Sequence, residues 1–189
     1  MLKSRLCIAF FAFAVGCAPA QKPLTDYVNP MLGTATLWDS VDLGFKPTKR
    51  TWGAEVFPGS SLPNAMVQVS PVTKFHSGAG YQYEDSVIYG FTHTNKGHWN
   101  LCHIPLLPVT GTPTPGDYCS PFSHERESAA PGYYQVFLDR YGVDAQLSST
   151  LRCAFHKYTY PAGAAASLLA DLQRSNEHVR AWDCLLYTS

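Results

Sequence analysis

The sequence predicts an all-β protein with the antiparallel sandwich architecture. The chain of 189 residues contains 14 Gly and 14 Pro, and aromatic residues make up 13% of it. In its second half, short runs that alternate apolar with polar residues recur about every ten residues, between turn signals. Many turns, many aromatic residues and closely spaced strands are typical of sandwiches and barrels rather than helical bundles.

The charge composition argues against nucleic acid as a partner. The formal net charge is zero, and only 15% of the residues are charged. No basic patch or charge run occurs along the chain, so the electrostatic attraction that nucleic-acid binding requires is not expected.

The first 20 residues are expected to be a signal peptide. Lys3 and Arg5 precede the apolar run 6–16, which is shorter than the ~20 residues that span a bilayer. We therefore expect an exported protein.

Two processing sites compete, and the sequence leaves both open. Residues 18–20, Ala-Pro-Ala, resemble an ordinary signal peptidase site, which would give a periplasmic or secreted protein. Residues 14–17, Ala-Val-Gly-Cys, resemble a lipobox. In that case Cys17 would carry lipid and anchor the protein to the outer membrane.

The mature chain begins with a polar linker, residues 21–26, and the domain is expected over residues 27–180. Its first segment, Tyr27 to Thr34, contains an Asn-Pro turn signal and Gly33, which can adopt a positive φ. One reading is a tight turn at the start of the domain. The other is a loop that approaches a ligand closely at Gly33, because no Cβ obstructs it.

Strands are expected next at Ala65–Val69, closed by Ser70–Thr73, and at Tyr81–Phe91, where bulky residues alternate. The polar segment Thr92–Asn100 predicts a loop on a rigid scaffold, where functional groups tend to lie. Two prolines limit Leu101–Pro108 to an edge or terminal strand.

A proline-rich connection is expected over 110–131. Glu125 and Glu127 within it are two residues apart, so on a strand they would point to opposite sides and make a poor acid–base pair. We expect a solvated, charged loop edge there. Strands are then predicted in the order of the following ranges: 133–138, 143–147, 150–160 and 166–172.

Histidines and tryptophans are the candidate ligand-contacting residues. His93, His98 and His103 recur every five residues, which places them on one face of neither a helix nor a strand. Only an irregular loop could bring them together with Asp85 around a metal. We therefore favour a different role for His93, as a hydrogen-bond donor to a ligand. Trp99, like Trp52, could stack on the apolar face of a sugar ring.

The cysteines do not indicate a metal site or a catalytic thiol. No pair is spaced C-x-x-C, so a structural zinc site is not supported. Cys102 and His103 are adjacent and would point apart in a strand, which disfavours nucleophilic catalysis.

Several segments, in this order, resemble one known family. They are Y-V-N-P-M-L-G-T from Tyr27, W-G-A-E-V-F-P-G from Trp52, L-P-N-A-M-V-Q-V-S-P from Leu62, G-Y-Q-Y-E-D-S-V-I-Y-G-F-T-H-T-N from Gly80, P-V-T-G from Pro108, F-S-H-E-R-E-S-A-A-P-G-Y-Y-Q-V-F-L from Phe122 and L-S-S-T-L-R-C-A-F-H-K-Y-T-Y-P from Leu147. Over Tyr27 to Asp171 the chain resembles the N-terminal domain of the glycoside hydrolase family 92 α-mannosidases.

The resemblance implies an exported, calcium-dependent exo-α-mannosidase that inverts the anomeric centre. It implies a β-sandwich that packs on a larger α/α toroid, with the sugar pocket between the two domains. In the family the catalytic acid, the base and most calcium ligands come from the toroid. We therefore expect an N-terminal fragment that lacks the toroid, has no catalytic residue and is inactive alone.

Four residues match family segments that border the pocket, and these are the expected sugar contacts: Gly33, Thr34, Asp85 and His93. Trp99 is a fifth expected sugar contact, proposed from the chemistry of its side chain and not from the resemblance. The chain departs from the family after His93, where H-T-N-K-G-H-W-N replaces the common H-T-H-L-S-G, so the linkage preference or the substrate is expected to differ from that of the commonest members. Residues 181–189 also leave the pattern and suggest a truncated or misread end.

Two alternatives from other classes remain. The chain could be a stand-alone carbohydrate-binding sandwich, or a metal-binding β protein that uses the histidine loop.

Overall fold

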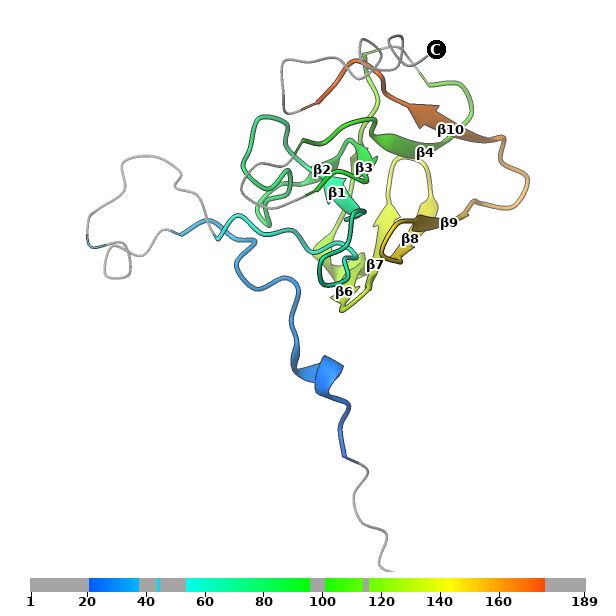
Figure 1. Ribbon diagram of the computed structural model, residues 1–189. Coiled ribbons are helices and arrows are strands. Elements are labelled where there is room, and N and C mark those ends of the chain that lie inside the picture. Colours follow the sequence, from blue (N-terminus) through cyan, green and yellow to red (C-terminus); the bar gives the residue numbers. More distant parts are fainter. Residues whose placement is uncertain (1–20, 38–43, 45–53, 96–100, 114–115, 176–189) are drawn as a thin grey trace, which may run out of the picture.

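A computed structural model describes residues 21–37, 44, 54–95, 101–113 and 116–175. Over these residues the regular structure is antiparallel β-sheet with two short 3-10 helices. Two four-stranded sheets lie over one another around a shared core (Figure 1). The prediction of an all-β antiparallel sandwich is confirmed.

The second sheet is a meander with the strand order β6-β7-β8-β9. Its strands are β6 (Glu127–Ala130), β7 (Tyr133–Leu138), β8 (Val143–Ser149) and β9 (Ala154–Thr159). Alternate residues of β7 and β8 are buried, because each strand turns one face to the core and the other to water. Neighbouring strands are joined by short turns, so the sheet forms from contacts that are close in sequence.

The first sheet combines strands that are far apart in sequence, in the order β1-β3-β4-β10. Its strands are β1 (Ser70–Val72), β3 (Gly90–Thr92), β4 (Leu106–Thr110) and β10 (Ala166–Ala170). A small separate pair joins β2 (Val87–Ile88) to β5 (Ser120–Pro121). The 3-10 helices are η1 (Leu24–Tyr27) and η3 (His124–Arg126).

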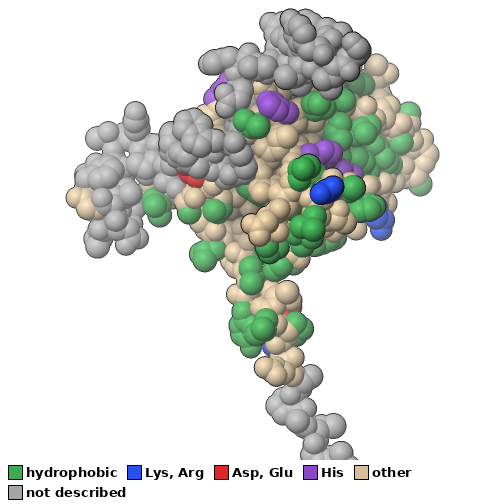
Figure 2. Space-filling model, in the orientation of Figure 1, with side chains coloured by type: hydrophobic (Ala, Val, Ile, Leu, Met, Phe, Trp, Pro, Cys, Tyr) green, Lys and Arg blue, Asp and Glu red, His purple; other side chains and the backbone are tan. Residues whose placement is uncertain are grey.

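Side chains from both sheets fill the core. Phe91 and Leu107 of the first sheet and Tyr134, Val136 and Leu147 of the second are at most 1% exposed and belong to one cluster. Packing of two half-apolar sheets is therefore the main source of stability. On the face drawn in Figure 2, few charged side chains are visible among the described residues, in line with the low charge content.

Two strand predictions in the first half are wrong in position. Ala65–Val69 is no strand: Gln68 and Val69 form only isolated bridges, and β1 begins at Ser70. Pro71 is tolerated in β1 because this strand is at the edge of its sheet. Within Tyr81–Phe91, only β2 and the first residues of β3 are strand.

Two further predictions placed less regular structure in the chain than is observed. Leu101–Pro108 was expected to be an edge or terminal strand at best, yet β4 lies between β3 and β10. Its pairing with β3 is confined to Leu106, so Pro108 has only β10 alongside it. The connection 110–131 contains β5, η3 and β6.

No helix in the described ranges is long and apolar enough to span a membrane.

Candidate functional site

Three of the expected sugar contacts lie around one segment of chain between β1 and β2. The backbone N–H of Tyr83 donates to the carbonyl of Thr34 at 3.1 Å, next to Gly33. The Thr73 hydroxyl donates to Asp85 Oδ2 at 2.9 Å. These contacts bring the loop that carries Gly33 and Thr34 against the turn that carries Asp85.

Gly33 and Thr34 are used by the chain's own packing. Gly33 has a φ of +87°, and a Cβ there would lie 2.8 Å from Ala54 Cβ and 3.2 Å from a Val56 methyl group. The Thr34 hydroxyl donates to the Met31 carbonyl at 2.8 Å, and Thr34 is only 4% exposed. The cleft around them measures about 10 Å³, room for about one water, so both residues shape the loop.

Asp85 lines a larger surface cavity, which we call the Asp85 hollow. Its volume is about 460 Å³, within the usual range of ~300–1,000 Å³ for small-molecule sites. Asp85 is half-buried, and the Tyr83 ring, 40% exposed, lies beside it. The hollow is lined by Tyr83, Glu84, Asp85, Ser86, Phe122, Ser123, His124 and Glu125.

The far wall of the hollow is the one-turn helix η3. The Ser123 side chain caps it by accepting the backbone N–H of Glu125 at 3.2 Å, as serine does at many helix N-termini. This turn presents His124 toward Tyr83, and the two rings stack with centroids 3.9 Å apart and an interplanar angle of 5°. The stack fixes one face of the Tyr83 ring.

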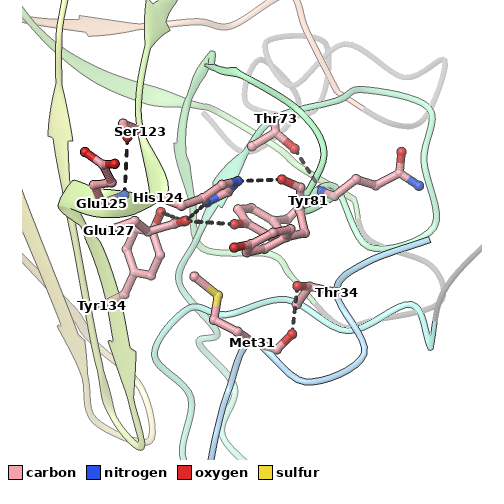
Figure 3. Close-up of polar contacts among 11 residues, drawn as sticks. Met31, Thr34, Thr73, Tyr81, Ser123, His124, Glu125, Glu127 and Tyr134 are labelled. Carbon is pink, nitrogen blue, oxygen red and sulfur yellow. Dashed lines mark hydrogen bonds and ion pairs between the residues drawn. The ribbon is translucent and has the colours of Figure 1, made fainter. Parts of the chain in front are cut away.

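Glu127 lies beneath this wall as a buried carboxylate (Figure 3). It pairs across β6 and β7 with the fully buried Val136, and cross-strand partners share a face. Its side chain is 0% exposed, so the charge must be satisfied internally. The hydroxyls of Tyr81 (2.9 and 3.0 Å) and Tyr134 (2.5 Å) donate to it.

His124 completes this cluster. Its Nδ1 lies 2.5 Å from Glu127 Oε2, and its Nε2 lies 2.6 Å from the carbonyl oxygen of Tyr83. Both nitrogens therefore face oxygen acceptors, and an N–H at Nδ1 donates to the carboxylate. The buried cluster thus links the Tyr83 turn to the second sheet.

Burial, and then the negative charge of Glu127, raise the pKa of the Tyr81 and Tyr134 hydroxyls. Both stay protonated and act as donors. With its oxygens occupied and shielded from water, Glu127 has no free position for proton exchange with a ligand. The sequence-based expectation of a solvated loop edge is therefore wrong for Glu127. The alternation of Glu127 with Ala129 just before β7 was the pattern that could have indicated a strand with Glu127 on its inner face.

His93 lies apart from the Asp85 hollow. The register of β1 and β3 puts His93 beyond the Ser70–Thr92 pair, whereas Thr73 lies beyond the opposite, Val72–Gly90 end. The structure thus places His93 and Asp85 at opposite ends of this strand pair.

His93 instead forms a half-buried pair with a histidine of β9. Its Nε2 lies 2.7 Å from Nε2 of His156, whose Nδ1 lies 2.6 Å from the Tyr158 hydroxyl. Burial lowers the pKa of His93, and burial together with His93 lowers the pKa of His156 to about 4. The two rings are neutral at pH 7 and share one proton between their Nε2 atoms.

The remaining candidates lie outside the described residues: Cys17, Trp52, His98 and Trp99. In the part of the chain that is described, no three His, Cys, Asp or Glu side chains come together as metal ligands. Within those ranges, His93, His103 and Asp85 are not gathered into the metal site that the histidine loop suggested. Cys102 is fully buried, and burial raises the pKa of its thiol to about 12, which disfavours the thiolate form that acts as a nucleophile.

Comparison with known proteins defines the class. The family model described as "Glycosyl hydrolase family 92 N-terminal domain" matches residues 27–185. The chain therefore belongs to glycosyl hydrolase family 92, as the ordered sequence segments indicated. No curated protein sequence matches the chain.

Solved structures of this family share the fold. A family 92 α-mannosidase from Bacteroides thetaiotaomicron in complex with mannoimidazole superposes with a TM-score of 0.67 at 32% identity, covering 82% of this chain and 20% of its own. A family 92 inverting mannosidase from the same organism gives 0.65 at 26% identity, with 81% and 20% covered. The glycosyl hydrolase ccman5 gives 0.61 at 28%, with 80% and 21% covered. The chain thus spans about a fifth of the length of these structures.

Proposed function

We propose that this chain is the N-terminal sandwich of an exported exo-α-mannosidase and forms one side of its sugar pocket at the Asp85 hollow. The observation that carries the proposal is the preformed geometry of this hollow. A carboxylate held by Thr73 lies beside an exposed aromatic ring held by His124. Family membership and the mannosidase structures above support α-mannosides as the substrate class.

The two side chains suit the two kinds of surface that a pyranose offers. The carboxylate oxygens of Asp85 can accept hydrogen bonds from sugar hydroxyls. The flat face of Tyr83 that His124 does not cover can lie against the apolar C–H side of the ring. Gly33 and Thr34 act indirectly, by holding the turn through the Thr34–Tyr83 hydrogen bond.

The chemical step is assigned to polypeptide outside this chain. An inverting hydrolase needs one carboxylic acid at the leaving oxygen and a second carboxylate that activates water, about 6.5–9.5 Å apart. The best-held carboxylate here, Glu127, is saturated with donors. We propose that the acid, the base and most calcium ligands belong to an α/α domain, which is the partner of this sandwich.

Export and anchoring are part of the same proposal. The charged and apolar pattern of residues 1–20 supports export, and lipid on Cys17 would hold the enzyme at the outer membrane.

A stand-alone carbohydrate-binding module is the second candidate. The observation that favours it is that the Asp85 hollow forms from this chain alone, without a second domain. The two candidates differ in affinity, because half of a pocket provides only half of the contacts.

Hydrolysis and calorimetry test the two candidates on the purified chain. With calcium present, we expect no release of product from aryl α-mannosides or mannobiose above the blank; turnover would contradict the assignment of catalysis to another domain. In isothermal titration, a half-site gives no measurable heat with mannose or mannobiose. Clear saturable heat would instead support the binding module.

A further inference from the structure

A second hollow lies where the end of β10 meets the turns after β1 and before β5, and we call it the Arg174 hollow. Its volume is about 760 Å³, and it shares no lining residue with the Asp85 hollow. It is lined by Thr73, Lys74, Phe75, His76, Tyr89, Gly116, Asp117, Tyr118, Cys119, Gln173, Arg174 and Ser175. None of its residues was singled out by the sequence.

Two aromatic rings hold the guanidinium of Arg174 in this hollow. Its central carbon lies 4.7 Å from the ring centroid of Tyr118 and 5.6 Å from that of Tyr89. The Tyr118 hydroxyl donates to Asp171, which fixes that ring. An arginine stacked in this way keeps its N–H donors at the rim of the plane, free to bind a planar or tetrahedral anion.

The protein itself leaves these donors poorly satisfied. Among the described residues, the guanidinium has the Gly116 carbonyl at 3.5 Å and Asp171 at 3.8 Å, and neither is a good hydrogen bond. The other carboxylate oxygen of Asp171 accepts hydrogen bonds from the backbone N–H groups of Gln173 (2.8 Å) and Arg174 (3.2 Å). The Arg174 side chain is 35% exposed, so a ligand can reach it.

The other charges of the hollow leave a positive balance. Asp117 is the opposing carboxylate, but Arg140 binds both of its oxygens at 3.1 and 3.0 Å and lowers its pKa. Lys74 is exposed on the lining and adds a second cation. With Asp171 beside Arg174 and Asp117 bound by Arg140, the charge of Lys74 leaves the hollow with a net positive charge for an anion to meet.

We propose that the Arg174 hollow is a second binding site, for a sugar unit that carries an oxyanion, either a carboxylate or a phosphate. Arg174 binds the oxyanion through paired N–H groups, and Lys74 adds a point charge. The rings of Phe75 and Tyr89 line the same hollow, 5.5 Å apart, and provide apolar surface for the pyranose body. The site is separate from the Asp85 hollow and does not depend on the function proposed for it.

The test is a titration of the full chain, monitored by NMR, with glucuronate, glucose 6-phosphate, inorganic phosphate and neutral glucose. We expect saturable binding of glucuronate, glucose 6-phosphate or both, and none of glucose. Which of the two binds identifies the source of the oxyanion. Absence of binding by both overturns the proposal, as does equal binding of glucose. Inorganic phosphate that binds as tightly as glucose 6-phosphate overturns the sugar part of it.

Variants locate the site. Arg174→Gln should weaken binding about tenfold or more, because hydrogen bonds to a charged group are lost. Arg174→Lys keeps the charge without the planar fork and should recover part of the loss. Arg152→Gln removes an exposed arginine that does not line the hollow and should change nothing. Binding that survives Arg174→Gln overturns the assignment.

Lys74→Gln tests the site with a substitution that should not affect folding. This exposed side chain has no hydrogen-bond partner among the described residues, so its loss should leave the thermal unfolding midpoint unchanged. We expect about a two- to fivefold weaker affinity from the lost point charge. Unchanged affinity in this variant would remove Lys74 from the site and contradict the charge argument.

Discussion

Glu127 is a buried charge that is fully compensated by its neighbours. Two tyrosine hydroxyls and the His124 ring donate to a side chain with no exposed surface. Such a cluster is costly to break, because each donor left without its acceptor stays desolvated.

We therefore expect Glu127→Gln to lower the free energy of unfolding by about 1–3 kcal/mol, because the amide offers one acceptor to three donors. The matched control is Glu125→Gln, an exposed acid two residues away, with a change within about 0.5 kcal/mol. Urea denaturation of both variants measures the difference. Equal stability of the two would contradict the buried cluster.

The His93–His156 pair makes stability depend on pH. The unfolded chain protonates His156 near its ordinary pKa of 6.5, but the folded chain only near a pKa of about 4. Between these values the unfolded state binds the extra proton, so the free energy of unfolding falls as the pH drops from about 6.5 to about 4. Phe91, His93 and Tyr158 surround the ring and provide no carboxylate to reverse the sign.

His156→Gln should flatten this part of the pH dependence, measured by urea denaturation at pH 7, 6, 5 and 4. His76→Gln is the control, because that histidine is exposed on the far end of β1. A variant that retains the full slope would show that the proton is taken up elsewhere.

At the scale of elements, β3 and β4 meet closely at Gly90. Its φ is +152°, and a Cβ there would lie 2.9 Å from Pro105 Cβ and 3.2 Å from the Leu106 carbonyl. This position thus requires glycine for conformation and for space.

Gly90→Ala should therefore destabilise the first sheet by more than Gly111→Ala. Gly111 also has a positive φ, +74°, but open space around its missing Cβ. We expect about 1–2 kcal/mol for Gly111→Ala from the backbone alone and a clearly larger loss for Gly90→Ala. Chemical denaturation of both variants is the measurement. A smaller loss at Gly90 would mean that β3 and β4 do not approach as described.

The sequence predicts elements well where local contacts form them. β7 and β8 have the expected positions because apolar alternation and the turn at Gly142 specify this hairpin locally. β1 and β4 were misplaced because their pairing depends on distant partners, which also tolerate Pro71 and Pro108. Tyr81 and Tyr83 alternate as in a strand, but hydrogen bonds to Glu127 and Thr34 hold them in the irregular segment before β2.

The candidate site could likewise be predicted only where it does not depend on contacts between distant parts of the chain. Family segments pointed to Gly33, Thr34 and Asp85, and the structure brings these three into one region. The sequence did not show that His93 lies at the other end of the strand pair, because this depends on the register of β1 and β3. Tyr83, His124 and Glu127 were missed because their roles arise only when η3 packs on the Tyr83 turn.

For the whole molecule, we propose that binding and catalysis are divided between two domains. The chain has the fold of the family's N-terminal domain and spans about a fifth of related structures. If the Asp85 hollow is half of a sugar pocket, as proposed, we expect its affinity to be too weak for calorimetry to measure. NMR detects binding in the millimolar range, about −4 kcal/mol.

The most direct test is a titration of the ¹⁵N-labelled chain with methyl α-mannoside at concentrations up to the millimolar range and above. We expect saturable shifts in the amides of residues 83–86 and 122–125. Asp85→Asn should greatly reduce these shifts, whereas Asp144→Asn, on the outer face of β8, should leave them intact. Shifts that cluster around His93 and His156 instead, or no shifts at all, would contradict the proposal.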